Sequence, residues 1–212
     1  MRALIIGATG ATGKDLVDVL SGDSNYTEVV LFVRRCSGIK DPKLIEIVTD
    51  FDRLENVSVH IRGDVLFSCL GTTLKAAGSK AAQRHIDYDI PLEFAELARS
   101  NGVDRLVLLS AYGADAKSWV FYSRLKGKLE HALEHVCFDQ YIIFRPGSLI
   151  RRNSDRTAER FMNATFKFLN VLGVMRRFRP LSTTTLAEKL AKAPQKLPLG
   201  KHVVELEKIF KF

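Results

Sequence analysis

Short apolar runs alternate with segments of helical spacing along the first 150 residues of the chain. The apolar runs have the length of buried strands, whereas the segments between them place apolar residues three or four positions apart, as helices do. The runs lie at 3–6, 29–33, 44–48, 64–70, 105–109 and 140–144. This alternation predicts an α/β fold, a doubly wound parallel sheet with helices on both faces.

The segments between the strands predict two long helices. Residues 81–100 are amphipathic and end at the helix-stopping pair Asn101-Gly102, and a second helix is expected from about Trp119 to His135. The linker 34–43 is short for a crossover, so we expect no full helix in it.

The alternation weakens after residue 150. Helices are expected at 156–172 and 186–191, the second capped by Thr183 or Thr184, and the chain ends with an amphipathic run at 202–212. We therefore expect one domain over 1–212, in which 151–212 forms a smaller part on the substrate side.

Composition narrows the class of protein. The chain has 212 residues, 46% of them apolar and 26% charged, and it contains no apolar run of membrane-span length. Because the first strand begins within the first few residues, we expect no secretory signal. The three cysteines are far apart in sequence, which favours reduced thiols and a cytoplasmic location. The net charge of +8 favours acidic ligands such as phosphates, but it is spread along the chain, so no specific nucleic-acid partner and no membrane are expected.

The first strand ends in the glycine-rich segment GATGATG, residues 7–13, after which helical spacing begins. Gly7 permits a sharp turn, Gly10 lets a pyrophosphate approach the backbone, and Gly13 lets the helix pack close to the strand. The unpaired N–H groups of the first helical turn then face the phosphates. The segment predicts a dinucleotide site.

The second strand ends in Arg34-Arg35, where an acidic residue would bind the ribose 2′-hydroxyl of NAD. A guanidinium instead suits a 2′-phosphate, so we expect NADP to be preferred, with NAD possible. Asp50 and Phe51 follow the third strand, where the adenine edge could be met. The fourth strand ends at Cys69-Leu70, and the small-residue loop Gly71-Thr72-Thr73 after it could lie against the ribose and phosphates. Cys69, Leu70, Gly71 and Thr72 are the candidate cofactor contacts here.

Catalytic candidates follow the fifth strand. Ser110 ends that strand, and Tyr122 and Lys126 share one face of the next helix because they are four residues apart. A lysine ammonium and an oxidised nicotinamide both favour a phenolate, so Lys126 is expected to lower the pKa of Tyr122 and to hold the nicotinamide ribose. Ser110 would hydrogen-bond a substrate carbonyl. His131 and His135 are also four apart, but they have no third ligand nearby, so no metal is expected.

A family resemblance follows from motifs that occur in order along the chain. These are GATGATG, CLGTT at 69–73, LLSAYGAD at 108–115, YSRLKGKLE at 122–130 and YIIFRPGSLI at 141–150. They resemble the atypical short-chain dehydrogenase/reductases, in particular the Tat-interacting-protein-like oxidoreductases and their bacterial relatives.

The resemblance implies an NADP-binding Rossmann fold and a catalytic pair at Tyr122 and Lys126. Pro146-Gly147 resembles the family's turn beside the nicotinamide, and Ala111 stands where relatives often carry a second hydroxyl residue. The cofactor contacts that it implies are Gly7, Thr9, Gly10, Ala11, Thr12, Arg34, Asp50, Phe51, Leu70, Gly71 and Thr72.

These observations favour an NADP-dependent oxidoreductase that moves a hydride between nicotinamide and a small carbonyl or alcohol substrate. Two alternatives remain open: a regulatory protein that senses NADP with little turnover, and an enzyme resembling sugar epimerases or dehydratases. The aromatic residues after position 150 are also compatible with a homodimer contact.

Overall fold

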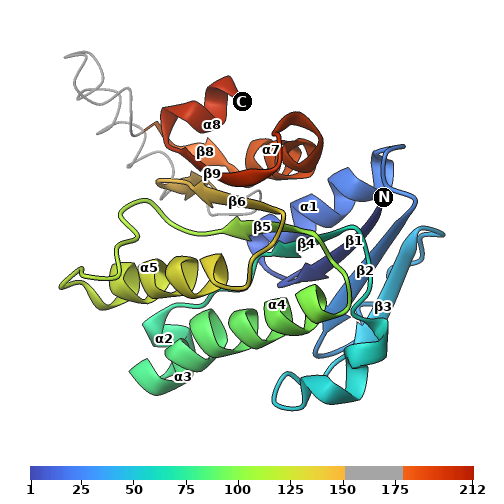
Figure 1. Ribbon diagram of the computed structural model, residues 1–212, viewed down its shortest axis with the longest axis horizontal. Helices are drawn as coiled ribbons and strands as arrows, with labels where there is room; N and C mark the ends of the chain where they lie inside the picture. Colours follow the sequence, from blue (N-terminus) through green and yellow to red (C-terminus); the bar gives the residue numbers. More distant parts are fainter. Residues whose placement is uncertain (151–178) are drawn as a thin grey trace.

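The computed structural model describes residues 1–150 and 179–212, in which seven parallel strands form one sheet of order β3-β2-β1-β4-β5-β6-β9 (Figure 1). The strands are β1 (Arg2–Ile6), β2 (Glu28–Val33), β3 (Leu44–Val48), β4 (Val65–Ser68), β5 (Arg105–Leu109), β6 (Gln140–Arg145) and β9 (Gly200–Glu205). A separate parallel pair joins β7 (Leu149–Ile150) to β8 (Leu181–Ser182). The strand order reverses between β1 and β4, so the carboxyl ends of these two strands flank the crevice where such sheets bind ligands.

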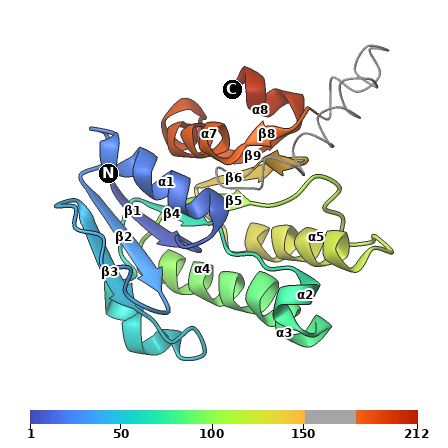
Figure 2. The ribbon, with the colours of Figure 1, turned by 180° about the vertical axis from the view of Figure 1, so that it is seen from behind.

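Helices cover both faces of the sheet (Figures 1 and 2). One face carries α1 (Ala11–Gly22), α7 (Thr183–Lys196) and α8 (Glu207–Lys211), and the opposite face carries η1 (Leu54–His60), α2 (Leu74–Ala77), α3 (Lys80–Arg84), η2 (His85–Asp89), α4 (Ile90–Ser100) and α5 (Phe121–Glu134). Each face has its own apolar core. Leu16 of α1 and Leu190 of α7 lie in one core, and Phe94 of α4 and Leu129 of α5 lie in the other.

The structure confirms the predicted fold class and the six predicted strands, with ends shifted by at most two residues. It also confirms that the linker 34–43 contains no helix. Strand β9 was not predicted. It is an edge strand in which only Val204 is buried, so its sequence lacks the apolar run of the central strands.

The predicted helix at 81–100 is interrupted by η2, one turn of π-helix, between α3 and α4. In this turn the Ile90 N–H bonds to the carbonyl of His85, five residues earlier. Pro91 explains the interruption, because proline has no N–H to donate to the carbonyl four residues earlier, that of Asp87, and its ring would crowd it. The widened turn contains Asp87, whose side chain is fully buried and accepts a hydrogen bond from the Thr72 N–H.

The C-terminal segment 179–212 corrects one prediction and leaves another untested. Ser182 caps α7 by accepting a hydrogen bond from the Thr185 N–H at 3.0 Å, so the expected cap at Thr183 or Thr184 was wrong by one or two positions. Helix α7 packs on α1, and β9 extends the main sheet beyond β6. The predicted helix at 156–172 lies outside the described residues, so the substrate-side role of 151–212 stays a prediction. Within the described residues, no helix combines the length and apolar character needed to cross a bilayer.

Candidate active site

Glycines shape the turn between β1 and α1. Gly7 has a φ of +83°, in the left-handed region, and a Cβ there would lie 2.5 Å from the carbonyl carbon of Cys69. A Cβ on Gly13 would lie 2.1 Å from the carbonyl oxygen of Gly7. Both contacts are to backbone, which cannot move aside as a flexible side chain could. The close approach of β1, α1 and the end of β4 therefore requires glycine at both positions, as the sequence predicted for this turn.

Helix α1 begins directly after this turn and presents backbone donors. Gly10 is its N-cap and provides no side-chain cap, and the first turn of the helix contains no acidic residue. The Gly10 N–H bonds to the Gly7 carbonyl at 3.0 Å, but the next N–H groups have no helical carbonyl to pair with. These donors and the positive end of the helix dipole suit a pyrophosphate. The turn thus fits the phosphates of a dinucleotide.

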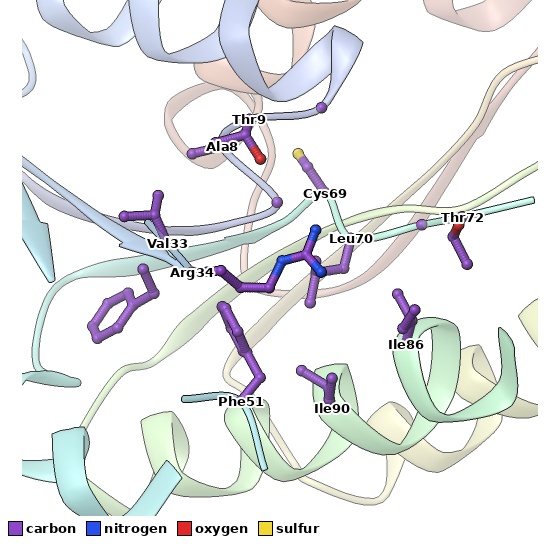
Figure 3. A pocket seen from close by; sticks show the side chains of 14 residues that line it. Ala8, Thr9, Val33, Arg34, Phe51, Cys69, Leu70, Thr72, Ile86 and Ile90 are labelled. Atoms are coloured by element: carbon purple, nitrogen blue, oxygen red, sulfur yellow. The ribbon is translucent and has the colours of Figure 1, made fainter. Parts of the chain in front are cut away.

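A first cavity of about 290 Å³ lies against the glycine turn. Figure 3 shows Arg34 extending across it, with Phe51 and Ile90 on one side and Thr9 and Cys69 on the other. Its lining consists of Gly7, Ala8, Thr9, Gly10, Phe32, Val33, Arg34, Phe51, Cys69, Leu70, Gly71, Thr72, Ile86 and Ile90. Backbone-rich loops on one wall and apolar side chains on the other suit phosphates and a base, respectively.

A second cavity of about 510 Å³ adjoins the first. Its lining consists of Gly10, Ala11, Thr12, Cys69, Leu70, Gly71, Thr72, Thr73, Ala76, Leu109, Ser110, Tyr122, Lys126, Leu149 and Thr183. The two cavities share Gly10 and the loop Cys69–Thr72. One extended ligand could therefore reach from the glycine turn to Tyr122 along this loop.

Tyr122 and Lys126 lie one turn apart on α5, and both line the second cavity, as their spacing predicted. Lys126 is 2% exposed, and its Nζ donates to the Leu70 carbonyl at 3.3 Å. The same Nζ lies 6.0 Å from the centre of the Tyr122 ring. Tyr122 is 39% exposed, so its ring is open to the cavity while the ammonium is enclosed.

The charges around this pair differ from expectation. Burial raises the pKa of Tyr122 above its ordinary value, and the carboxylate of Asp87 raises this pKa further. Burial lowers the pKa of Lys126, and Asp87 opposes that effect. The expectation that Lys126 lowers the pKa of Tyr122 is therefore not met in the protein without cofactor. No sequence signal marked Asp87, because its position depends on the π-turn.

Ser110 also lines the second cavity, but its hydroxyl donates to the carboxylate of Glu130. Arg145 holds the same carboxylate through two hydrogen bonds, Nε to Oε1 at 3.1 Å and Nη2 to Oε2 at 2.5 Å. A hydroxyl carries one proton, so Ser110 bonded to Glu130 offers only acceptor lone pairs to a ligand. Its predicted role as donor to a substrate carbonyl would require that bond to break. Ala111 provides no hydroxyl in its place.

Several predicted cofactor residues lie outside the lining of both cavities, and their contacts with a cofactor stay predictions. Arg35 and Asp50 are exposed, and Asp50 accepts a hydrogen bond from the Asp52 N–H at 3.1 Å. The Pro146 carbonyl accepts from the Tyr112 N–H at 2.9 Å. The complete set is Gly13, Arg35, Asp50, Pro146 and Gly147.

Other lining residues were missed. Val33 and Leu109 end β2 and β5, so the rule that ligands bind at carboxyl strand ends could have identified them. Ile86 and Ile90 belong to the interrupted helix, and no sequence signal marked them as lining. Thr183 comes from a segment distant in sequence, brought to the cavity by the β7-β8 pair.

The cysteines and histidines of the described residues form no metal site. Cys36, Cys69 and Cys137 are free thiols, and burial raises the pKa of Cys69 to about 12. His131 and His135 pack edge to face with ring centres 4.7 Å apart. Across 1–150 and 179–212, no three His, Cys, Asp or Glu side chains are grouped so that they could hold a metal ion.

A family profile and individual relatives place this chain in the same protein family. A family profile described as NAD(P)H-binding matches residues 7–170. Protein HTATIP2 of Rattus norvegicus is 37% identical over 150 residues, covering 69% of this chain and 62% of the rat protein. The mitochondrial protein FMP52 of Kluyveromyces lactis is 34% identical over 152 residues, covering 71% of this chain and 68% of that protein. This chain thus spans less than two thirds of the rat relative.

Solved structures share the fold at low sequence identity. The oxidoreductase ylbE from Lactococcus lactis has a TM-score of 0.71 and 18% identity, covering 95% of this chain and 89% of that chain. MoeE5 in complex with UDP-glucuronic acid and NAD has a TM-score of 0.72 and 17% identity, covering 97% and 76%. At these identities the likeness concerns the Rossmann-like architecture.

Proposed function

This chain belongs to the NAD(P)H-binding family of atypical short-chain dehydrogenase/reductase-like proteins, and we propose that it is an NADP(H)-dependent oxidoreductase. It would transfer a hydride between nicotinamide and a small carbonyl or alcohol substrate. The observation that carries the proposal is the junction of the two cavities along the loop Cys69–Thr72. The phosphate-binding end of a dinucleotide and the Tyr122–Lys126 pair then share one continuous crevice.

Tyr122, Lys126 and Ser110 would have different roles in the reaction. The glycine turn and the loop Cys69–Thr72 would hold a dinucleotide, whose nicotinamide would supply or accept the hydride. The Tyr122 hydroxyl donates its proton to the carbonyl oxygen during reduction and takes it back during oxidation. Lys126 is held by the Leu70 carbonyl and would orient the nicotinamide ribose, as the family resemblance implies. Ser110 would accept a hydrogen bond in the cavity while its own hydroxyl proton is donated to the Glu130 carboxylate.

The preference for NADP is supported by Arg34, which crosses the first cavity next to Val33 at the end of β2 (Figure 3). A guanidinium there offers paired donors to a 2′-phosphate and no acceptor for a ribose hydroxyl. Arg34→Glu should weaken NADPH binding far more than NADH binding. Arg62→Glu is the matched control, since Arg62 has the same charge, is exposed and lines neither cavity. Equal losses for both nucleotides in Arg34→Glu would remove the phosphate argument.

Measuring whether the protein consumes NADPH distinguishes an oxidoreductase from a protein that only senses the cofactor. NADPH absorbance is followed over time with a panel of aldehydes, ketones and quinones, using wild type, Tyr122→Phe and the control Tyr88→Phe. The enzyme reading predicts a decay in wild type and Tyr88→Phe, with a rate lower by about 10²-fold or more in Tyr122→Phe. NADPH binding without decay in any variant would favour the sensor.

The proposed location is the cytoplasm, supported by three free cysteines in the described residues. The fungal relatives carry the word mitochondrial in their names. Fractionation of cells that express the full natural protein tests the location. Recovery in a membrane-bounded organelle fraction would overturn it.

A further inference from the structure

A fully buried carboxylate, that of Asp87, lies beside the proposed catalytic pair. It belongs to the π-turn η2, and its Oδ1 accepts a hydrogen bond from the Thr72 N–H at 2.7 Å. Its Oδ2 is buried and has no hydrogen-bond partner within the described residues. A buried carboxylate is costly unless a hydrogen bond or an opposite charge compensates it. Thr72 supplies the hydrogen bond, and the charge must come from a neighbouring cation.

The same carboxylate helps to hold the loop that joins the two cavities. Gln83 donates from Nε2 to the Thr72 carbonyl at 3.0 Å, and Lys126 donates to the Leu70 carbonyl at 3.3 Å. With the bond from Thr72 to Asp87, three side chains fix the backbone of this short loop. Any ligand that crosses from the glycine turn to Tyr122 passes this loop, so its position controls the alignment of the two parts of the site.

The other charges near Lys126 are already compensated. Cys69 is neutral at physiological pH because burial raises the pKa of its thiol to about 12. The Glu130 carboxylate is bound by Arg145 and Ser110.

On the π-turn itself, His85 and Asp89 are partly exposed and pair outward. His85 contacts Asp52 at 2.7 Å, and Asp89 contacts Arg84 at 3.5 Å. Asp87 is thus the buried carboxylate at the loop that Lys126 also holds, Asp87 through the Thr72 N–H and Lys126 through the Leu70 carbonyl. Burial raises the pKa of the Asp87 carboxyl, whereas the Lys126 ammonium and the Thr72 hydrogen bond lower it.

We propose that Asp87 is a positioning residue for the Tyr122–Lys126 pair, a role that rests on the proposed function. Its Oδ1 fixes the loop at Thr72, and its negative charge keeps the enclosed Lys126 ammonium charged. The same charge opposes loss of the proton from Tyr122. Tyr122 therefore stays a proton donor in the protein without cofactor, ready for carbonyl reduction.

The first test reads the protonation of Tyr122 without cofactor or turnover. The chain contains five tyrosines, so ¹³Cζ-tyrosine labelling gives five NMR signals, and Tyr122→Phe identifies that of Tyr122. Asp87→Asn keeps an acceptor for the Thr72 N–H but removes the charge. We expect the Tyr122 titration to move to lower pH in Asp87→Asn and to stay in place in Asp89→Asn, the control on the same turn. An unchanged or raised titration in Asp87→Asn overturns the proposal.

The second test does not depend on reading Tyr122. Urea unfolding is measured for Asp87→Asn, Lys126→Met and the double variant, which form a double-mutant cycle. If the two charges compensate each other, the double variant loses less stability than the sum of the single losses. Additive losses overturn the proposal. Both tests use the protein alone, so absence of turnover with every substrate would defeat the proposed function without deciding the role of Asp87.

Discussion

Replacing glycine by alanine should have opposite effects on stability at the two ends of α1, because only the first end packs against the glycine turn. Gly13→Ala would place a Cβ 2.1 Å from the Gly7 carbonyl oxygen and 2.9 Å from the Gly7 carbonyl carbon. Such overpacking against backbone costs about 1–3 kcal/mol. For a domain of this length, a loss of about 2 kcal/mol lowers Tm by about 4–8 °C.

Gly22→Ala is the matched control, because Gly22 is the last residue of the same helix and its Cβ would meet nothing within 4 Å. This substitution should stabilise the protein by up to about 1 kcal/mol, since alanine loses less backbone entropy in a helix. Calorimetry or urea unfolding of both variants shows directly whether each substitution stabilises or destabilises the protein. A Gly13→Ala variant as stable as wild type, or a Gly22→Ala variant that loses as much as Gly13→Ala, would refute the close approach of α1 to the turn.

Two further predictions concern stability. Glu130→Ala removes the carboxylate that binds Ser110 and Arg145 and leaves the partly exposed Arg145 with Glu205 at 3.6 Å, so it should cost about 2 kcal/mol in urea unfolding. Glu134→Ala breaks the exposed pair with Lys201 and should cost less than about 1 kcal/mol. Similar costs for both variants would contradict the buried position of Glu130. Burial raises the pKa of Tyr26 and of Tyr141 in the folded protein. Their contribution to the free energy of unfolding should therefore be fully present and constant below the ordinary tyrosine pKa near 10. Above that pH it should fall by about 1.4 kcal/mol per pH unit for each tyrosine, because only the unfolded chain loses these protons. Unfolding followed by tyrosine absorbance should show this alkaline loss, and a free energy of unfolding that stays constant from pH 9 to pH 12 would contradict the burial of both hydroxyls.

Features that depend on neighbouring residues alone could be predicted from the sequence. The apolar run before Gly7 and the helical spacing after Gly13 predict the turn and the start of α1 directly behind it. The four-residue spacing of Tyr122 and Lys126 places both side chains in one cavity because a helix turns once in that interval.

The features that the sequence did not predict depend on contacts between distant segments. Pro91 was visible, but its effect on Asp87 required knowing that the helix continues on both sides of the interruption. The hydrogen bond of Ser110 to Glu130 joins residues 20 positions apart on different elements. Strand β9 is recognisable only by its pairing with β6, since most of its side chains are exposed or half-exposed.

A dinucleotide seated on the glycine turn should reach Tyr122. Titration of the ¹³Cζ-tyrosine-labelled protein with NADP⁺ measures this contact directly. We expect a saturable change in the signal of Tyr122, with the signals of the buried Tyr26 and Tyr141 unchanged. If the Tyr122 signal stays constant while NADP⁺ and NAD⁺ are each raised to millimolar concentration, this expectation is contradicted.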